Sequence, residues 1–144
     1  MALDDKKIDP DAAVDGRIAD AVRARLEEGR LPCEAAHAAA DALGVEPIEV
    51  GRTADQLRIR LTACQLGLYG FPGHAKGWEA VDVASRPVPD GLEGALLAAR
   101  NERGEISCDR LWRQAERFSV PLIHVGYLAD RLGIKIRSCQ LGAF

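Results

Sequence analysis

Two stretches of this sequence are nearly the same, and they constrain the fold more than any other feature. Residues 57–67 read LRIRLTACQLG, and residues 132–142 read LGIKIRSCQLG. The displacement of 75 positions holds without a gap between residues 15–67 and residues 90–142, and about 20 of roughly 53 aligned pairs are identical. The pattern predicts an internal duplication, with two homologous lobes related by a pseudo-twofold axis.

The duplication predicts four segments along the chain. Residues 1–14 are expected to be a flexible lead-in, 15–67 the first repeat, 68–89 a linker rich in Gly and Pro, and 90–144 the second repeat. A repeat of about 53 residues is near the lower limit for an independent core, so we expect the lobes to pack against each other or against another copy. In the linker, Trp78 is expected to pack over the lobe interface rather than to bind a ligand.

Each repeat carries the signals of three helices. The first helices are expected to begin after Asp15 and Asp90, which are favoured N-caps, and to end at Gly29 and Gly104. Apolar residues recur between these positions at helical spacing. The expected bounds of the later helices are 32–43 and 107–118 for the second and about 47–57 and 121–132 for the third.

The second and third helices of each copy resemble a helix-turn-helix. In the first copy the small residue Ala40 precedes the turn residue Gly44 by four positions and the aliphatic Val50 by ten. The second copy repeats this spacing with Ala115, Ser119 and Val125. In this motif a small residue lets the two helices approach and buried aliphatic residues fix their crossing. The turn residue of the second copy departs from the usual Gly, and a generic helical lobe remains the alternative.

After the third helix the period of apolar residues changes from helical to two. Leu57, Ile59 and Leu61 alternate with polar residues, and residues 132–136 repeat the pattern. Each lobe is therefore expected to end in one strand, which makes it resemble a winged helix. No turn for a two-stranded wing precedes Gly67, so the two strands are alternatively expected to pair antiparallel with each other across the pseudo-twofold axis. The predicted fold class is mainly α with short β strands (α+β).

The segment LGIKIRSCQLG at residues 132–142 also resembles a recurring segment of an uncharacterised prokaryotic family, a resemblance that implies no activity. The net charge of −3 argues against a strongly basic nucleic-acid binder. The charge is uneven, because residues 90–144 carry eight Lys and Arg against seven Asp and Glu, whereas residues 15–67 carry seven against nine. A surface that binds anions is therefore expected mainly on the second repeat.

The leading hypothesis is a non-enzymatic helix-turn-helix protein that binds double-stranded DNA and regulates transcription. His124, Tyr127 and Arg131 share one face of the expected third helix of the second repeat, where a recognition helix would contact phosphates and base edges. The candidate DNA-binding residues are Arg52, Arg58, Arg60, Arg110, Arg113, Arg117, His124, Tyr127, Arg131, Lys135 and Arg137.

The third helices also carry features that favour a different function. Gly51 and Gly126 occupy the same position in both copies, and a glycine inside a helix costs about 1 kcal/mol relative to alanine. We therefore expect another backbone to press there, either that of DNA or that of a neighbouring helix. Glu49 and Asp55 on the first of these helices would repel phosphate. The alternative function is a protein-interaction module on a degenerate helix-turn-helix scaffold, binding a protein partner or a second copy through the third helices.

Four cysteines form two matched pairs, Cys33 with Cys108 and Cys64 with Cys139. Cys33 and Cys108 fall in the first turn of the second helices, where the helix dipole favours a thiolate, so they are the candidate reactive thiols. Either Cys33 meets Cys64 within one lobe and Cys108 meets Cys139 within the other, or Cys64 and Cys139 meet each other across the axis. We expect four reduced, mostly buried thiols. A thiol or metal sensor is a minor alternative.

Several classes of function lack their sequence signals. No set of Cys and His recurs at ligand spacing, so we expect no metal and no cofactor. The chain has no GxSxG, no phosphate-binding glycine loop followed by Lys and Ser or Thr, and no HExxH, so we expect no enzyme. No apolar run is long enough for a signal peptide or a membrane span, which predicts a cytoplasmic protein without a membrane partner.

Overall fold

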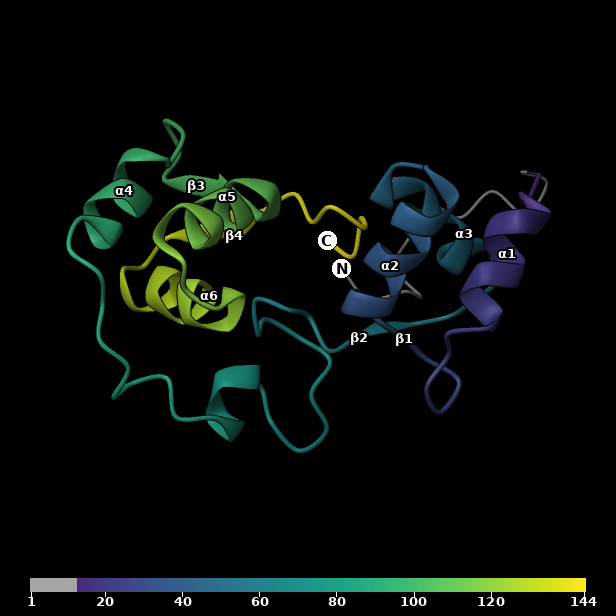
Figure 1. Ribbon diagram of the computed structural model, residues 1–144, viewed down its shortest axis with the longest axis horizontal. Helices are drawn as coiled ribbons and strands as arrows, with labels where there is room; N and C mark the ends of the chain where they lie inside the picture. Colours follow the sequence, from purple (N-terminus) through teal and green to yellow (C-terminus); the bar gives the residue numbers. More distant parts are fainter. Residues whose placement is uncertain (1–12) are drawn as a thin grey trace. The chain divides into compact units, whose positions relative to one another are not determined.

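The computed structural model describes residues 13–144, and these form a mainly helical protein with a few short strands (Figure 1). The described residues contain six α-helices, one 3-10 helix and four strands of two or three residues. The predicted class, mainly α with short β, is therefore confirmed. The predicted lead-in, residues 1–14, lies almost entirely outside the described residues.

Two compact units make up the described chain, and their limits differ from those of the predicted repeats. The first unit comprises the residues up to Cys64 together with Gln140–Phe144, and the second unit comprises Gln65–Cys139. The chain thus leaves the first unit at the start of one QLG sequence and returns to it at the start of the other. We call residues 65–67 and 140–142 the QLG segments. Each belongs to the unit formed mainly by the other repeat.

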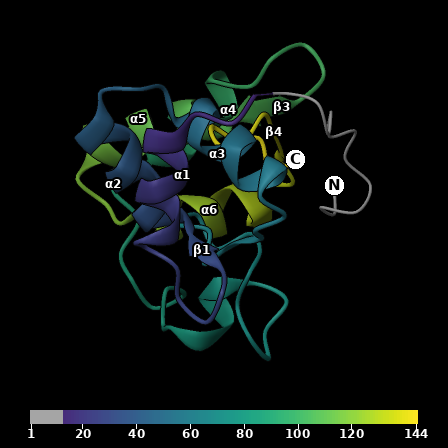
Figure 2. The same ribbon diagram turned by 90° about the vertical axis from the view of Figure 1, so that its right-hand side faces the viewer.

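Three helices that pack on one another form most of the first unit (Figures 1 and 2). They are α1 (Gly16–Arg23), α2 (Cys33–Leu43) and α3 (Pro47–Gln56). Asp15 caps α1 as expected, because its carboxylate accepts the N–H groups of Arg17 and Ile18 at 2.9 and 3.4 Å. The helix ends at Arg23, before the predicted stop at Gly29, since residues 27–30 form a tight turn closed by two backbone hydrogen bonds.

The second unit contains helices at matching positions in the sequence. They are α4 (Leu92–Ala98), α5 (Cys108–Phe118) and α6 (Leu122–Arg131), and a 3-10 helix, η2 (Gly77–Ala80), precedes them. The predicted cap at Asp90 is wrong. Gly91, in the left-handed conformation with φ 87°, is the N-cap of α4, and no side chain caps that helix. The helix consequently begins one residue later than α1 does in its own repeat.

The turn between the second and third helices has the same backbone conformation in both units. Gly44 ends α2 with φ 67° and ψ 32°, and Ser119 ends α5 with φ 54° and ψ 44°. Both values are left-handed, a conformation that glycine adopts readily and serine does not. Ala40, Ala115, Val50 and Val125 are buried beside these turns, as the spacing predicts. The bounds of α5 and α6 are those of α2 and α3 displaced by 75 positions.

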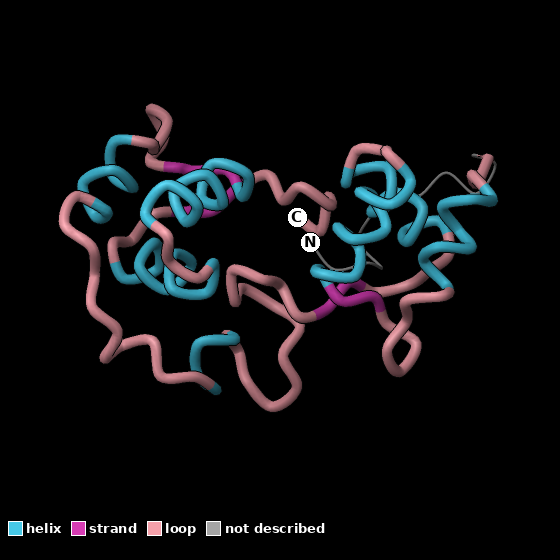
Figure 3. The backbone as a smooth tube through the Cα atoms, viewed as in Figure 1, coloured by secondary structure: helices cyan, strands magenta, loops and turns pink. Residues whose placement is uncertain are grey.

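Each unit contains one short pair of parallel strands (Figure 3). In the first unit β1 (Leu31–Pro32) pairs with β2 (Leu61–Thr62), and in the second β3 (Glu105–Ser107) pairs with β4 (Lys135–Arg137). The expected antiparallel pairing of the two later strands is therefore wrong. The reason lies at the end of each third helix, where positive φ angles at Arg58 (59°) and Gly133 (69°) turn the chain back along the strand that precedes the second helix.

The predicted linker, residues 68–89, is part of the second unit. Its 3-10 helix contacts α6, and the ring of Trp78 lies 6.0 Å from that of Tyr127 in an edge-to-face arrangement. Trp78 also lies against Gly67, where an added Cβ would come within 2.8 Å of the indole. The tryptophan therefore packs within this unit, around the QLG segment of residues 65–67.

Candidate interaction site

The third helix of each unit is covered by a QLG segment. In the first unit a Cβ added to Gly51 of α3 would overlap the carbonyl oxygen of Leu141 and lie 2.7 Å from its carbonyl carbon. In the second unit a Cβ on Gly126 of α6 would overlap the carbonyl oxygen of Leu66 and lie 2.9 Å from its carbonyl carbon. The predicted close approach at both glycines is confirmed. The neighbour is a non-helical backbone of the same chain.

Each covering segment is held by a buried leucine and by a glycine that turns the chain. Leu66 and Leu141 are each 1% exposed. The glycines that follow them have positive φ angles, 87° at Gly67 and 76° at Gly142. Burial of one leucine side chain contributes about 1.5–3 kcal/mol to the free energy of unfolding, so each segment adds substantially to the stability of its unit.

Burial removes one of the predicted DNA contacts. His124 is fully buried in α6, so the prediction that it lies on an exposed stripe with Tyr127 and Arg131 is wrong. Neither imidazole nitrogen of His124 has a hydrogen-bond partner among the residues that the structure describes. Burial, with a smaller contribution from the positive charge of Arg86, lowers the pKa of this histidine.

The rest of the predicted stripe on α6 is only partly available. Tyr127 is half-buried, with Trp78 on one side and the guanidinium of Arg131 5.8 Å from its ring centre. Arg131 itself is exposed. A helix with a buried histidine and a packed tyrosine offers little surface to a groove of DNA.

On the first unit the candidate residues are exposed but do not gather on a recognition helix. Arg52 projects from α3 and forms an ion pair of 3.0 Å with Glu49, with side chains 68% and 48% exposed. Arg58 and Arg60 follow the helix and are also exposed. The carboxylate beside Arg52 reduces its net attraction for phosphate.

Among the predicted DNA-binding residues, the largest group of exposed cations lies on the outward face of α5. We call Arg110, Arg113 and Arg117 the α5 arginine face, since all three are exposed on the side opposite the buried Leu111 and Ala115. Their internal contacts are long or solvent-exposed: Arg110 donates to the carbonyl of Ala99 at 3.3 Å, Arg113 lies 3.5 Å from Asp109, and the guanidinium of Arg117 lies 5.1 Å from the ring of Phe118. Breaking such exposed contacts costs little free energy, so the three side chains are available to a partner.

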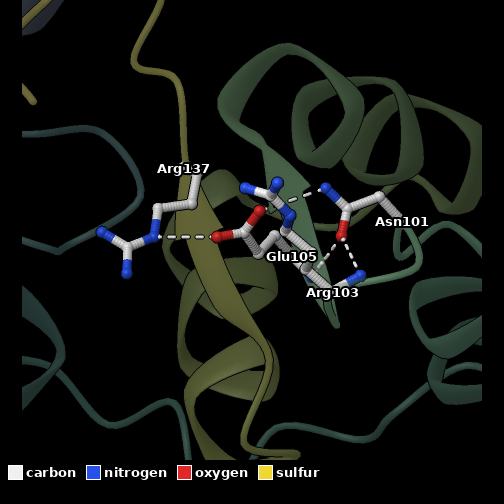
Figure 4. A network of polar contacts seen from close by, with 4 residues as sticks. All are labelled: Asn101, Arg103, Glu105 and Arg137. Carbon is white, nitrogen blue, oxygen red and sulfur yellow. Dashed lines mark hydrogen bonds and ion pairs between the residues drawn. The ribbon is translucent and has the colours of Figure 1, made fainter.

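Lys135 and Arg137, the two candidates on β4, are exposed. Arg137 belongs to a polar network with Glu105, Asn101 and Arg103 (Figure 4). Arg137 donates from Nε to a carboxylate oxygen of Glu105 at 3.1 Å across the strand pair. Asn101 accepts the N–H groups of Arg103 and Glu105, each at 2.9 Å, and donates to the Glu105 carboxylate at 3.2 Å. These contacts, the hydrogen bond from Asn101 first, lower the pKa of Glu105. Arg137 therefore has a structural partner, whereas Lys135 is the more available cation.

None of the four cysteines forms a disulfide among the residues that the structure describes, and three of them are buried. The two candidate reactive thiols, Cys33 and Cys108, are only 5% and 6% exposed. The half-exposed thiol is that of Cys139, which the sequence did not single out. No group of three or more possible metal ligands occurs within residues 13–144, and none of the helices there is long and apolar enough to span a membrane.

Sequence reasoning missed Leu66 and Leu141 as the residues that cover the third helices. A signal was present, because QLG is identical in both copies. Paired glycines in the third helices and an invariant non-helical segment are complementary features. Only the three-dimensional structure shows that the QLG segments contact these glycines.

Comparison of the chain with protein families, with curated proteins and with solved structures gives no match.

Proposed function

We propose that this chain is a non-enzymatic protein-interaction module on a helix-turn-helix scaffold, and that the α5 arginine face binds an acidic surface of a partner protein. The observation that carries the proposal is the cover over Gly51 and Gly126. A helix that reads DNA must present its outer face to the major groove. Here the chain's own backbone lies against that helix in each unit.

The composition of α5 supports a protein partner. Half-exposed Trp112 and Phe118 flank the α5 arginine face, and Arg117 stacks on Phe118. Arginine and aromatic residues are enriched among the residues that contribute most to protein–protein binding. The acidic overall charge is also unfavourable for binding to a polyanion.

The test compares two probes of similar charge, an acidic peptide that contains aromatic residues and a short DNA duplex. We expect the peptide to bind the full chain more tightly than the duplex, and Arg113→Ala with Arg117→Ala to weaken peptide binding at least about tenfold, as loss of two interfacial arginines predicts. Arg52→Ala, which removes an exposed arginine from α3, is the matched control and should leave binding unchanged. Preference for the duplex, or no binding of the peptide, contradicts the proposal.

DNA binding is a second candidate function, supported by the exposed cations of the second unit. The α5 arginine face and Lys135 offer up to four phosphate contacts without requiring a recognition helix. Binding of this kind is expected to be weak and independent of base sequence.

Retention on DNA at about 50 mM salt, where weak phosphate contacts persist, tests this candidate. Arg113→Ala with Arg117→Ala should reduce the slope of log K against log salt by about 2, since each lost phosphate contact reduces it by about 0.9. Absence of retention at that salt concentration rules the candidate out.

A further inference from the structure

Each unit contains two cysteines placed at equivalent points of its strand pair. Cys33 and Cys108 are the first residues of α2 and α5, and each directly follows the strand that precedes that helix. Cys64 and Cys139 each stand two residues after the later strand, β2 or β4. Because β1 is parallel to β2 and β3 is parallel to β4, both cysteines of a unit lie at the same end of its strand pair.

Hydrogen bonding brings Cys108 next to Cys139. The register of the strand pair ends with Ser107 beside Arg137, one residue before Cys108. Beyond it, Cys108 donates its N–H to the carbonyl of Ser138 at 3.2 Å. Cys139 directly follows that carbonyl, so the two cysteines belong to adjacent stretches of backbone. A disulfide accepts Cα separations of about 4.4–6.8 Å, so cysteines can form one only where two backbones lie side by side in this way.

The two pairs differ in access to solvent. Cys33 and Cys64 are each 5% exposed. Cys108 is 6% exposed, but Cys139 is half-exposed. A small reagent therefore has a partly exposed cysteine to attack only in the second unit, and the first unit, with two buried cysteines, provides an internal control.

We propose that Cys108 and Cys139 form a redox-active dithiol that closes to a disulfide by exchange with a small-molecule disulfide. This inference is independent of the proposed function. The Cys139 thiolate attacks one sulfur of the small disulfide, and one small thiolate leaves. The Cys108 thiolate, at the N-terminus of an α-helix where the dipole favours negative charge, then attacks the Cys139 sulfur and expels the second. Two electrons pass from the protein sulfurs to the reagent, and the two cysteine protons end on the released thiols.

The chain's connectivity gives this site a structural consequence. Cys139 directly precedes Gln140–Phe144, the segment that lies in the first unit and covers Gly51 through Leu141. A disulfide would tie the start of that segment to the first residue of α5. Oxidation in the second unit would thereby restrict the segment that covers α3.

The experiment treats the full chain with oxidised glutathione and counts thiols under native conditions. We expect loss of two of the four thiols, recovery on reduction, and a peptide map that links Cys108 to Cys139. Loss of no thiols, or a link between any other pair, overturns the proposal.

Variants resolve the two chemical steps. Cys108→Ser should trap glutathione on Cys139, whereas Cys139→Ser should acquire none, and Cys33→Ser should still form the Cys108–Cys139 link. Glutathione on Cys33 or Cys64 instead contradicts the assignment. If Cys108→Ser fails to fold, the peptide map of the unsubstituted chain decides the question.

Discussion

The carbonyl group of Leu141 occupies the space that a side chain on Gly51 would need. The same relationship joins Leu66 to Gly126. Both contacts lie between residues far apart in the sequence, and both place a segment from one repeat on the third helix of the other. Each third helix is therefore packed against a QLG segment of the chain itself, and this contact limits the surface that the helix offers to a partner.

Substitution of either buried glycine tests this relationship. Gly51→Ala and Gly126→Ala should each lower the free energy of unfolding by about 0.5–2 kcal/mol, because displacing a buried leucine costs about 1.5–3 kcal/mol while alanine returns about 1 kcal/mol of helix propensity. Denaturant unfolding measures the change. Hydrogen exchange should also increase in residues 140–144 for the first variant and in residues 65–67 for the second.

Two other helical glycines provide matched controls. Gly16 and Gly94 have no heavy atom within 4 Å of an added Cβ and no positive φ angle. Alanine at these positions should leave the free energy of unfolding unchanged or raise it by up to about 1 kcal/mol. Equal destabilisation by all four substitutions would show that the QLG segments do not press on the third helices.

The turn after α5 offers a stabilising substitution. Ser119 adopts φ 54° and ψ 44°, where glycine is favoured over other residues by roughly 1 kcal/mol. Ser119→Gly should therefore raise the free energy of unfolding by about 0.5–1 kcal/mol. Gly44→Ala, at the corresponding turn of the first unit, should lower it by a similar amount, since φ is 67° there. Opposite signs in thermal unfolding of the two variants are the expected result.

His124 predicts a loss of stability in mild acid. Its pKa is lowered from the ordinary value of 6.5 by burial first and by Arg86 second. The unfolded chain therefore binds a proton before the folded chain does as the pH falls below 6.5. The free energy of unfolding should decrease from about pH 7 downward until the folded pKa is passed.

Replacement of the imidazole separates this effect from that of other groups. His124→Leu removes two buried nitrogens without partners in the described part of the chain, so it should raise the free energy of unfolding by about 1–2 kcal/mol at pH 7 and flatten the pH dependence. His37, whose pKa is also lowered by burial, should account for the dependence that remains. Undiminished pH dependence in the leucine variant would assign the effect elsewhere.

The polar network before β3 predicts a side-chain effect on the strand pair. Asn101 accepts two backbone N–H groups, so Asn101→Ala should lower the free energy of unfolding by about 1 kcal/mol, the net value of one or two such bonds with exposed partners. Arg103→Ala is the control, because its backbone N–H remains bonded to Asn101. Chemical denaturation of the two variants should differ in midpoint, and identical midpoints would deny Asn101 a structural role.

Features that depend only on neighbouring residues follow directly from the amino-acid sequence. Asp15 caps α1 because its carboxylate reaches N–H groups two and three residues away. Gly44 ends α2 because a left-handed residue is needed there, and the bounds of α2, α3, α5 and α6 follow from local spacing of apolar residues. Asp90 shows the limit of such reasoning, since one left-handed glycine beside it moved the start of α4.

Burial and strand pairing could not be predicted in this way, because they depend on segments that are distant in the sequence. His124, Tyr127 and Arg131 share a helical face by spacing, but Leu66 and Trp78, more than 40 residues earlier, cover that part of α6. The direction of strand pairing was likewise not encoded in the alternation of apolar residues, which is the same for parallel and antiparallel partners. Positive φ angles at Arg58 and Gly133 turn the chain and set this direction. Each QLG segment, which follows the later strand, then belongs to the unit formed mainly by the other repeat.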